Sequence, residues 1–135
     1  MSAPTNHSYR RLIRFADTDA AGVAHFSRLL VIVEEALHDF FQHCGVSIFD
    51  EASAWPFVSI HADYKAGCRF GDEITVTLSL PRIGTSSLTV SFEATRKGGQ
   101  LCFCGTATLC HVNPSQNTPA PIPTETRDAL HADHL

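Results

Sequence analysis

Two carboxylates, Asp17 and Asp19, stand directly ahead of an apolar segment in the stretch RFADTDAAGVAHFSRLLVIVEEALHDFF, residues 14 to 41. Burying an ionised carboxylate is costly unless it is paired or hydrogen-bonded, so such groups either cap a turn or take part in chemistry. An Asp ahead of a helix is most often a cap worth about 1 kcal/mol of stability. Residue types alone therefore favour the structural role and leave the catalytic one open.

The chemistry open to this segment depends on the helix that follows it. The N-terminus of a helix presents unpaired N–H groups and about half a positive charge, which suits an oxyanion developing on a carbonyl group. Asp19 precedes Phe26, and Gly22 between them lets the backbone turn sharply. A partly buried, ionised Asp19 at this helix end would either attack a carbonyl carbon or remove a proton from water. Neither route needs a metal or an organic cofactor.

One strand and one long helix are predicted to hold this segment. Residues 7–15 are a candidate strand in which apolar and polar residues alternate only loosely. From about Ser27 to Cys44 the pattern is helical, with Ser27 accepting a bond from an orphan N–H at the start and Gly45 ending the helix. Because apolar residues cover most of its circumference, we expect other structure to enclose this helix.

Further along the chain, apolar residues recur at every second position instead of with the helical period. Val58, Ile60, Ala62 and Tyr64 alternate with polar residues, and segments 71–81, 86–97 and 100–112 repeat the pattern around a Gly98-Gly99 turn. This alternation predicts an antiparallel meander with one face on the core. The end of the chain is Pro-rich up to Pro123, and a short helix is expected from Thr124.

These elements predict an α+β fold of the hotdog type, in which an antiparallel sheet wraps around one central buried helix. We expect a single domain over residues 1–135, with 112–135 as a Pro-rich tail. Exposed sheet edges invite pairing with another copy, so a homodimer or a homotetramer built as a dimer of dimers is expected.

Composition limits the compartment and the partners. The net charge is −4, the basic residues are scattered, and no apolar run reaches the length of a membrane span, so neither nucleic acid nor a membrane is expected as a partner. The N-terminus lacks the apolar stretch of a secretory signal. Five cysteines without a CxxC pair do not suggest a disulfide framework. We therefore expect a cytoplasmic protein.

From about Ser8 to Arg127 the chain resembles the 4-hydroxybenzoyl-CoA thioesterase family of hotdog proteins. The most specific part is DTDAAGVAHFSRLL, and weaker matches are ADYKAGCRFGDEITV, GTSSLTVSFEA and the closing PIP. ADTDAAGVAHF is most similar to the subgroup that cleaves 1,4-dihydroxy-2-naphthoyl-CoA. The resemblance implies an acyl-CoA thioesterase that releases coenzyme A and a free, aromatic acid.

The resemblance also implies roles for individual residues. Asp19 matches the catalytic carboxylate, and the backbone N–H of Phe26 matches the donor that polarises the thioester carbonyl, with Gly22 shaping the turn. The residue types themselves suggest supporting and substrate-binding roles for the following residues: Asp17 bonding the turn, Glu34 as the buried partner of the turn, His25 and Ser27 lining the pocket, and Arg69 and Arg96 meeting the phosphates of coenzyme A. Lys65, Arg82 and Lys97 are further basic candidates for the phosphates.

Two departures from the family pattern leave other functions open. His25 stands where an aromatic Tyr or Trp is usual, which affects the acyl pocket, and Gly67 replaces a common Pro in what is expected to be only a loop. The alternatives are a thioesterase for short aliphatic acyl groups, an enoyl-CoA hydratase on the same fold, and a non-catalytic acyl-CoA-binding module. His25 falls one residue too far from Asp19 for the hydratase pattern. Glu34, His38 and His61 do not by themselves make a metal site.

Overall fold

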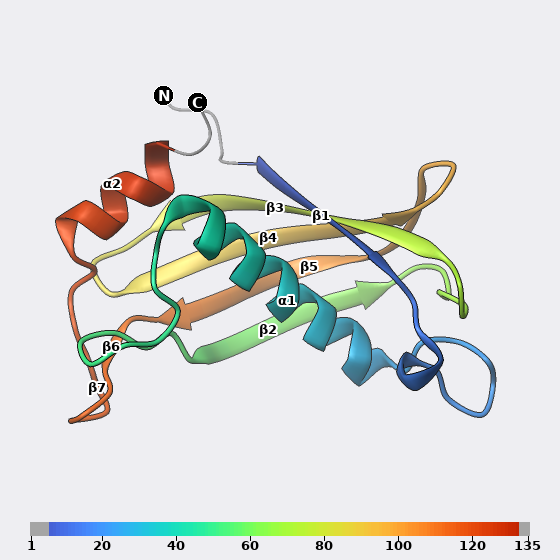
Figure 1. Cartoon of the computed structure of the whole chain (residues 1–135), viewed down its shortest axis with the longest axis horizontal. Coiled ribbons are helices and arrows are strands. Elements are labelled where there is room, and N and C mark those ends of the chain that lie inside the picture. The colour runs from blue at the N-terminus through green and yellow to red at the C-terminus, as the bar shows by residue number, and fades with distance from the viewer. Residues whose placement is uncertain (1–5, 133–135) are drawn as a thin grey trace.

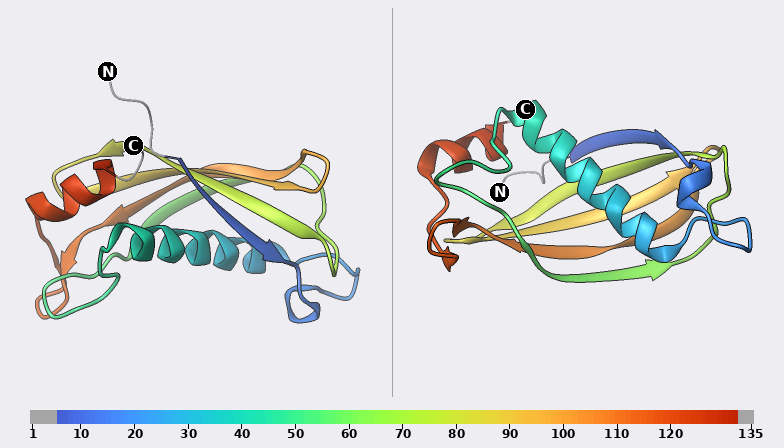
Figure 2. Two further views of the ribbon diagram at one scale, coloured as in Figure 1. Left: turned by 45° about the horizontal axis from the view of Figure 1, so that its top comes forward. Right: turned by 60° about the horizontal axis from the view of Figure 1, so that its bottom comes forward.

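The computed structural model describes residues 6–132. The elements follow in the order β1 (Asn6–Leu12), the short 3₁₀ helix η1 (Phe15–Asp17), α1 (Phe26–Cys44), β2 (Phe57–Tyr64), β3 (Glu73–Ile83), β4 (Ser87–Arg96), β5 (Gln100–Cys110), β6 (Val112–Asn113), β7 (Thr118–Pro119) and α2 (Thr124–Ala132). The long helix α1 lies along the concave side of the curved sheet (Figures 1 and 2). The predicted hotdog arrangement is thus confirmed.

The strands of the main sheet are antiparallel and lie in the order β1-β3-β4-β5-β2. The predicted meander is correct for β3, β4 and β5. It is wrong for β2, which pairs with β5 at the far edge, because residues 65–72 carry the chain across the end of the sheet before β3 begins. Alternation identifies strands but does not say which strands are neighbours.

Helix α1 is buried on the side that faces the sheet, where Ile32, Ala36 and Phe40 are among the fully covered residues. Gly45 ends the helix in the left-handed conformation, as predicted. The predicted cap at Ser27 is wrong. The capping residue is His25, whose ring accepts the Ser27 N–H, so the helix begins one residue earlier, at Phe26.

Strand β2 leaves a row of apolar side chains uncovered. Val58 and Ile60 are 60% and 39% exposed, and Tyr64 is exposed as well. The expectation that this row faces the core is wrong for a single chain, since β2 is an edge strand and α1 does not cover it. Leu30 and Val31 on α1 are also only partly buried, so the helix is less enclosed than predicted.

Strands β5 and β2 approach each other closely at Gly105. The register pairs Gly105 with Ala62, and a Cβ added at this glycine would overlap the backbone carbonyl of His61. A side chain is therefore excluded where the edge strand joins the sheet.

A polar cluster lies at the end of the sheet where β2 begins. His111 is buried, its Nδ1 lies 2.9 Å from the Ala120 carbonyl oxygen, and its Nε2 lies 2.8 Å from Ser53 Oγ. The Trp55 ring packs edge-on against His111 with centroids 4.9 Å apart. Near this end α2 begins at Thr124 as predicted, and Arg127 donates to the carbonyls of Ile83 and Gly84.

Within residues 6–132, no helix is long and apolar enough to cross a membrane.

Candidate active site

The segment that carries Asp19 folds as a small hairpin. The Asp19 N–H donates to the Val23 carbonyl at 3.0 Å, and Thr18 pairs with Ala24. Gly22 has φ of 80°, a conformation that glycine adopts without strain, and its N–H donates to the Asp19 carbonyl. The predicted sharp turn at Gly22 is therefore present, and it brings Asp19 and the start of α1 onto the two limbs of one hairpin.

Asp19 itself is exposed in the single chain, so the expectation of partial burial is wrong here. The reason is that Asp19 lies at the turn of the hairpin, whereas residues 67–69 contact the other limb, at Val23 and Ala24. One carboxylate oxygen, Oδ1, accepts the Ala21 N–H at 2.8 Å, whereas Oδ2 has no donor within the described part of the chain. This carboxylate is oriented by the turn and keeps one oxygen free.

The N–H of Phe26 is the first amide of α1. Among residues 6–132 no atom accepts it, because the first amides of a helix have no carbonyl of the same helix four residues earlier. The amide is thus one of the orphan donors of a helix N-terminus, as predicted for the residue that polarises a carbonyl.

Asp17 lies in the interior, with only 1% of its surface exposed. Arg11 donates to it through both terminal nitrogens, the Arg14 amide donates at 2.8 Å, and Arg28 donates at 3.1 and 3.2 Å. Burial alone would raise the pKa of Asp17, but these hydrogen bonds lower it to about 2. Asp17 bonds the turn, as expected, and it also connects the turn to β1 and α1.

A cleft of about 320 Å³ opens beside the N-terminus of α1. Its walls are mostly apolar and come from the helix start and the segment that follows β2; they comprise Ala24, Phe26, Leu29, Tyr64, Lys65, Ala66, Gly67 and Cys68. The Phe26 and Tyr64 rings meet edge to face, with centroids 6.5 Å apart. Small-molecule sites have volumes from about 300 Å³ upward and walls of this kind.

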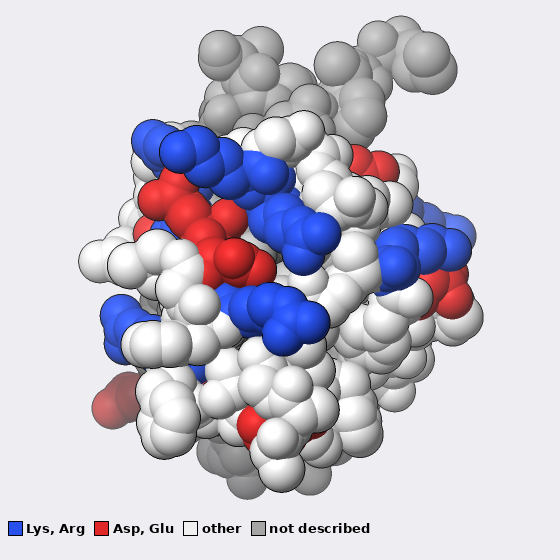
Figure 3. Space-filling model, turned by 90° about the vertical axis from the view of Figure 1, so that its right-hand side faces the viewer, with Lys and Arg blue, Asp and Glu red and all other residues white. Residues whose placement is uncertain are grey.

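Basic residues lie around the same end of the molecule. Figure 3 shows this end, where Lys and Arg are interspersed with Asp and Glu. Lys65 is at the cleft, Arg69 pairs with Val23 of the hairpin, and Arg96 donates to the Gly67 carbonyl at 2.8 Å. A second depression of about 580 Å³ is lined partly by Arg96 and Lys97 together with Asp72 and Glu73. Arg82 pairs with Thr89 at the opposite end of β3, which removes it from this group.

Several sequence expectations for the site need correction. Glu34 is exposed on α1 and is not the buried partner of the turn; its neighbour Glu35 accepts a bond from Arg11 at 2.7 Å, and Arg11 in turn donates to Asp17. Gly67 is not merely part of a loop, because it lines the cleft and a Cβ there would lie 3.3 Å from Val23. His25 and Ser27 lie at the helix start, hydrogen-bonded to each other at 2.8 Å, but neither is among the residues that line the cleft.

Two sets of residues were missed by sequence reasoning. The cleft walls at Tyr64, Ala66 and Cys68 lie in a stretch that carries the family resemblance, which was the available signal. The pairing of Arg11 and Arg28 with Asp17 had no such signal, because strand and helix spacing do not reveal a contact between them. In the described part of the chain, no group of three His, Cys, Asp or Glu residues is placed to hold a metal ion.

The chain matches known proteins both in sequence and in fold. A model of the thioesterase-like superfamily matches residues 13–130, which include the hairpin, α1 and strands β2 to β7 but not β1. The chain belongs to the thioesterase-like superfamily. The predicted family and the predicted class of enzyme, a thioester hydrolase, are confirmed at this level.

Individual superfamily members are similar over much of the chain. A 1,4-dihydroxy-2-naphthoyl-CoA hydrolase of Acaryochloris marina is 30% identical over 123 residues, which are 87% of this chain and 90% of that protein. One from Synechococcus is 37% identical over 92 residues, and that match spans 62% of each protein, less than two thirds. Among solved structures, a Synechocystis thioesterase covers 93% of this chain and 95% of its own, with a TM-score of 0.86 and 23% identity. That structure supports the fold.

Proposed function

We propose that this chain hydrolyses aromatic acyl-CoA thioesters to the free acid and coenzyme A. The observation that carries the proposal is the unpaired Phe26 N–H, which opens beside an apolar cleft at the base of the hairpin that holds Asp19. The relatives named as 1,4-dihydroxy-2-naphthoyl-CoA hydrolases support a bicyclic aromatic acyl group as the first substrate to try.

In the proposed reaction the thioester carbonyl oxygen accepts the Phe26 N–H, so that the helix end stabilises the oxyanion. If Asp19 is the nucleophile, its free oxygen bonds to the acyl carbon, the C–S bond breaks, coenzyme A leaves as the thiolate, and water cleaves the mixed anhydride. If Asp19 is a base, it takes a proton from the water that attacks the carbonyl. A single turnover in ¹⁸O-labelled water tests for the first route. Label found in the Asp19 carboxylate would show that a mixed anhydride had formed, because the base route leaves this carboxylate unlabelled.

The residues that line the cleft suit an aromatic acyl group. Phe26 and Tyr64 provide aromatic faces and edges that a flat ring can pack against, and Leu29 and Cys68 form apolar surface behind them. The Tyr64 hydroxyl donates to the Phe26 carbonyl at 3.5 Å, and desolvation raises its pKa, so it is a neutral donor that can turn to a polar substituent on the ring. His25 and Ser27 stay proposed contacts at the rim.

The phosphates of coenzyme A are proposed to lie over Arg69 and Arg96, with Lys65 at the mouth of the cleft. These cations surround the helix start, and Lys65 makes no ion pair with another described residue. A polyanionic tail would therefore leave the cleft toward this end of the molecule (Figure 3).

We propose that the chain forms a homodimer, or a tetramer made of two such dimers, because one side of β2 is left uncovered. A third depression, of about 210 Å³, lies between α1 and β2 and is lined by Leu30, Val31, Glu34, Phe57 and Ile60. Together with the unpaired edge of β2, this apolar surface suits a second copy that continues the sheet. A cytoplasmic location is proposed from the cysteine content, and the chain is proposed to fold as one domain.

The central test measures thiol release by purified protein and by Asp19→Asn. We expect hydrolysis of aromatic acyl-CoAs and a loss of at least about 100-fold in kcat for the variant, the low end for a positioned acid–base group. Asp50→Asn is a matched control, because Asp50 Oδ1 also accepts the amide two residues later, from Ala52 at 2.8 Å, far from the cleft. A wild-type rate in Asp19→Asn would rule out its catalytic role.

A substrate screen separates the alternatives. Faster turnover of short aliphatic acyl-CoAs would move the proposal to that substrate class, and loss of absorbance from an enoyl-CoA would favour the hydratase. Saturable binding that protects against heat, with no hydrolysis of any thioester, would indicate a non-catalytic binding module.

A further inference from the structure

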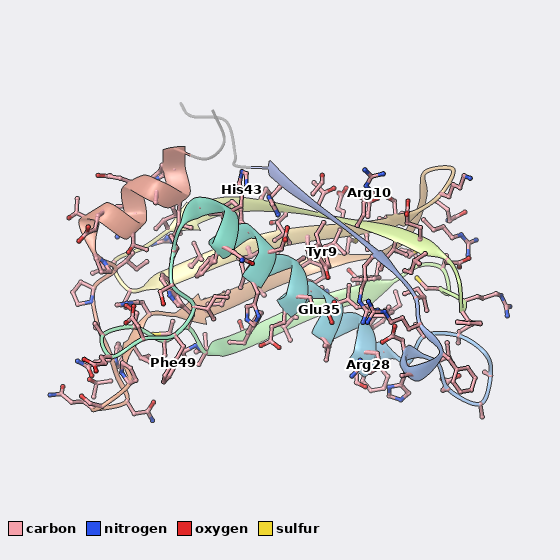
Figure 4. The ribbon with its side chains drawn as sticks, viewed as in Figure 1. Tyr9, Arg10, Arg28, Glu35, His43 and Phe49 are labelled. Carbon is pink, nitrogen blue, oxygen red and sulfur yellow. The ribbon has the colours of Figure 1, made fainter. Side chains whose placement is uncertain are left out.

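The ion cluster between β1 and α1 consists of Tyr9, Arg11, Asp17, Arg28 and Glu35, of which Arg11 and Asp17 are buried. Figure 4 shows Tyr9, Glu35 and Arg28 along the seam between the strand and the helix. Glu35 accepts from Arg11 at 2.7 Å and from the Tyr9 hydroxyl at 3.2 Å, and Asp17 accepts from both arginines. Two cations are balanced by two carboxylates, which is the condition under which buried charges are tolerated.

Asp17 is the member of this ion cluster that touches the hairpin. Its carboxylate accepts the Arg14 N–H from the segment before the hairpin, and its backbone carbonyl accepts the His25 N–H, at 2.9 Å, from the segment after it. The hairpin is therefore closed at its base by Asp17, directly beside the capping residue of α1. Asp19 and the Phe26 N–H lie immediately beyond these two closing positions.

Arg28 fixes Asp17 to the first turn of α1. Its Nε and Nη2 both approach Asp17 Oδ1, at 3.2 and 3.1 Å, so the guanidinium is held by two contacts. A cation in the first turn opposes the helix dipole, so this position is unfavourable for stability unless the cation is paired. The pairing indicates that Arg28 holds the hairpin in a fixed position relative to the N-terminus of α1.

We propose that Asp17 and Arg28 are positioning residues for thioester hydrolysis. They hold the limb that carries Asp19 at a fixed separation from the Phe26 N–H, so that a carbonyl is bound and attacked in one orientation. This inference depends on the proposed function, because the two groups being aligned are the proposed carboxylate and oxyanion donor. Misplacing a catalytic group by about 1 Å can reduce the rate by roughly 100-fold.

The competing explanation is that the ion cluster only attaches β1 to α1. The same strand and helix are joined a second time by His7 and Asp39, whose side chains lie 2.7 Å apart. That pair joins the same two elements away from the hairpin, near the C-terminal half of α1. Asp39→Asn is therefore a matched control for the attachment alone.

The test compares kcat, KM and Tm of Asp17→Asn, Arg28→Gln, Arg28→Lys and Asp39→Asn with one aromatic acyl-CoA. We expect kcat to fall at least 10-fold in Asp17→Asn and Arg28→Gln with KM within about threefold. Asp39→Asn should keep kcat within twofold of wild type. Arg28→Lys, which keeps the charge, should regain part of the kcat lost in Arg28→Gln. Arg28 is 41% exposed, so its variants should fold even if Asp17→Asn does not.

Two results would overturn the proposal. One is an active wild-type enzyme whose Arg28→Gln variant keeps kcat within twofold. The other is a loss of kcat in Asp39→Asn that matches the loss in Asp17→Asn, which would assign both effects to stability. A wild-type protein that hydrolyses no thioester would instead refute the proposed function, and the inference with it.

Discussion

Two carboxylates two residues apart have different environments. Asp17 is buried among arginine and amide donors, whereas Asp19 is exposed and keeps one oxygen without a donor in the described residues. A carboxylate that accepts so many bonds is poorly suited to attack a substrate, because its lone pairs are occupied. The free oxygen of Asp19 is the better candidate for bond making or proton transfer.

The environment of Asp17 predicts how stability depends on pH. The pKa of Asp17 is about 2 in the folded chain, below its ordinary value of 3.8. A group whose folded pKa is lowered contributes stability above the unfolded value, and that contribution is lost as pH falls toward the folded value. We expect Asp17 to contribute at most about 2 kcal/mol above pH 4, declining between about pH 4 and pH 2.

Urea unfolding of wild type and Asp17→Asn across this range measures that contribution. The difference in unfolding free energy between the two proteins should be largest at neutral pH and should shrink as pH falls from 4 to 2. Other carboxylates titrate equally in both proteins and therefore cancel. A difference that stays constant from pH 6 to pH 2.5 would contradict the role assigned to the ionised Asp17.

At the scale of the elements, much of the fold could be predicted from the sequence. The helical period from about Ser27 to Cys44, the stop at Gly45 and the alternation in β3, β4 and β5 each follow from local rules, and the structure has all of them, with the helix starting one residue earlier. The partner of β2 could not be predicted, because alternation is the same for an edge strand beside β5 as for one beside β3. Nor could the contacts of Arg28, since a non-local ion pair leaves no periodic signal.

The junction of β5 and β2 should be the least tolerant position in the sheet. A methyl group at Gly105 would overlap the His61 carbonyl, so the edge strand would have to move away and lose ladder hydrogen bonds. We expect Gly105→Ala to lower stability by about 3 kcal/mol or more, within the range for a buried clash. Thermal unfolding measures this loss.

Ala107→Gly provides a comparison for the Gly105 variant. Ala107 also pairs with β2, opposite Ile60, but carries an ordinary side chain. Its substitution should cost only about 1 kcal/mol for backbone freedom plus a small loss of burial. Equal or smaller destabilisation by Gly105→Ala would show that the edge strand can shift freely.

At the scale of the whole molecule, the apolar row on β2 and the open side of α1 predict association. Ile60→Glu places a charge in the depression between them and should shift the protein toward monomer in light scattering after gel filtration. Phe49→Glu is the control, because Phe49 is 71% exposed but lies in the connection between α1 and β2 (Figure 4) and does not line this depression. Unchanged mass in Ile60→Glu, or equal dissociation by Phe49→Glu, would contradict an interface on β2.

The single tryptophan of the chain, Trp55, lies at the end of the sheet where β2 begins, and the acyl cleft lies where β2 ends. Its indole packs on a buried imidazole, an environment that disappears when the chain opens. Intrinsic fluorescence therefore gives a readout of folding that is remote from the ligand. Titrations with absorbing acyl-CoA analogues can be followed by other probes while emission from this one residue reports whether the protein stays intact.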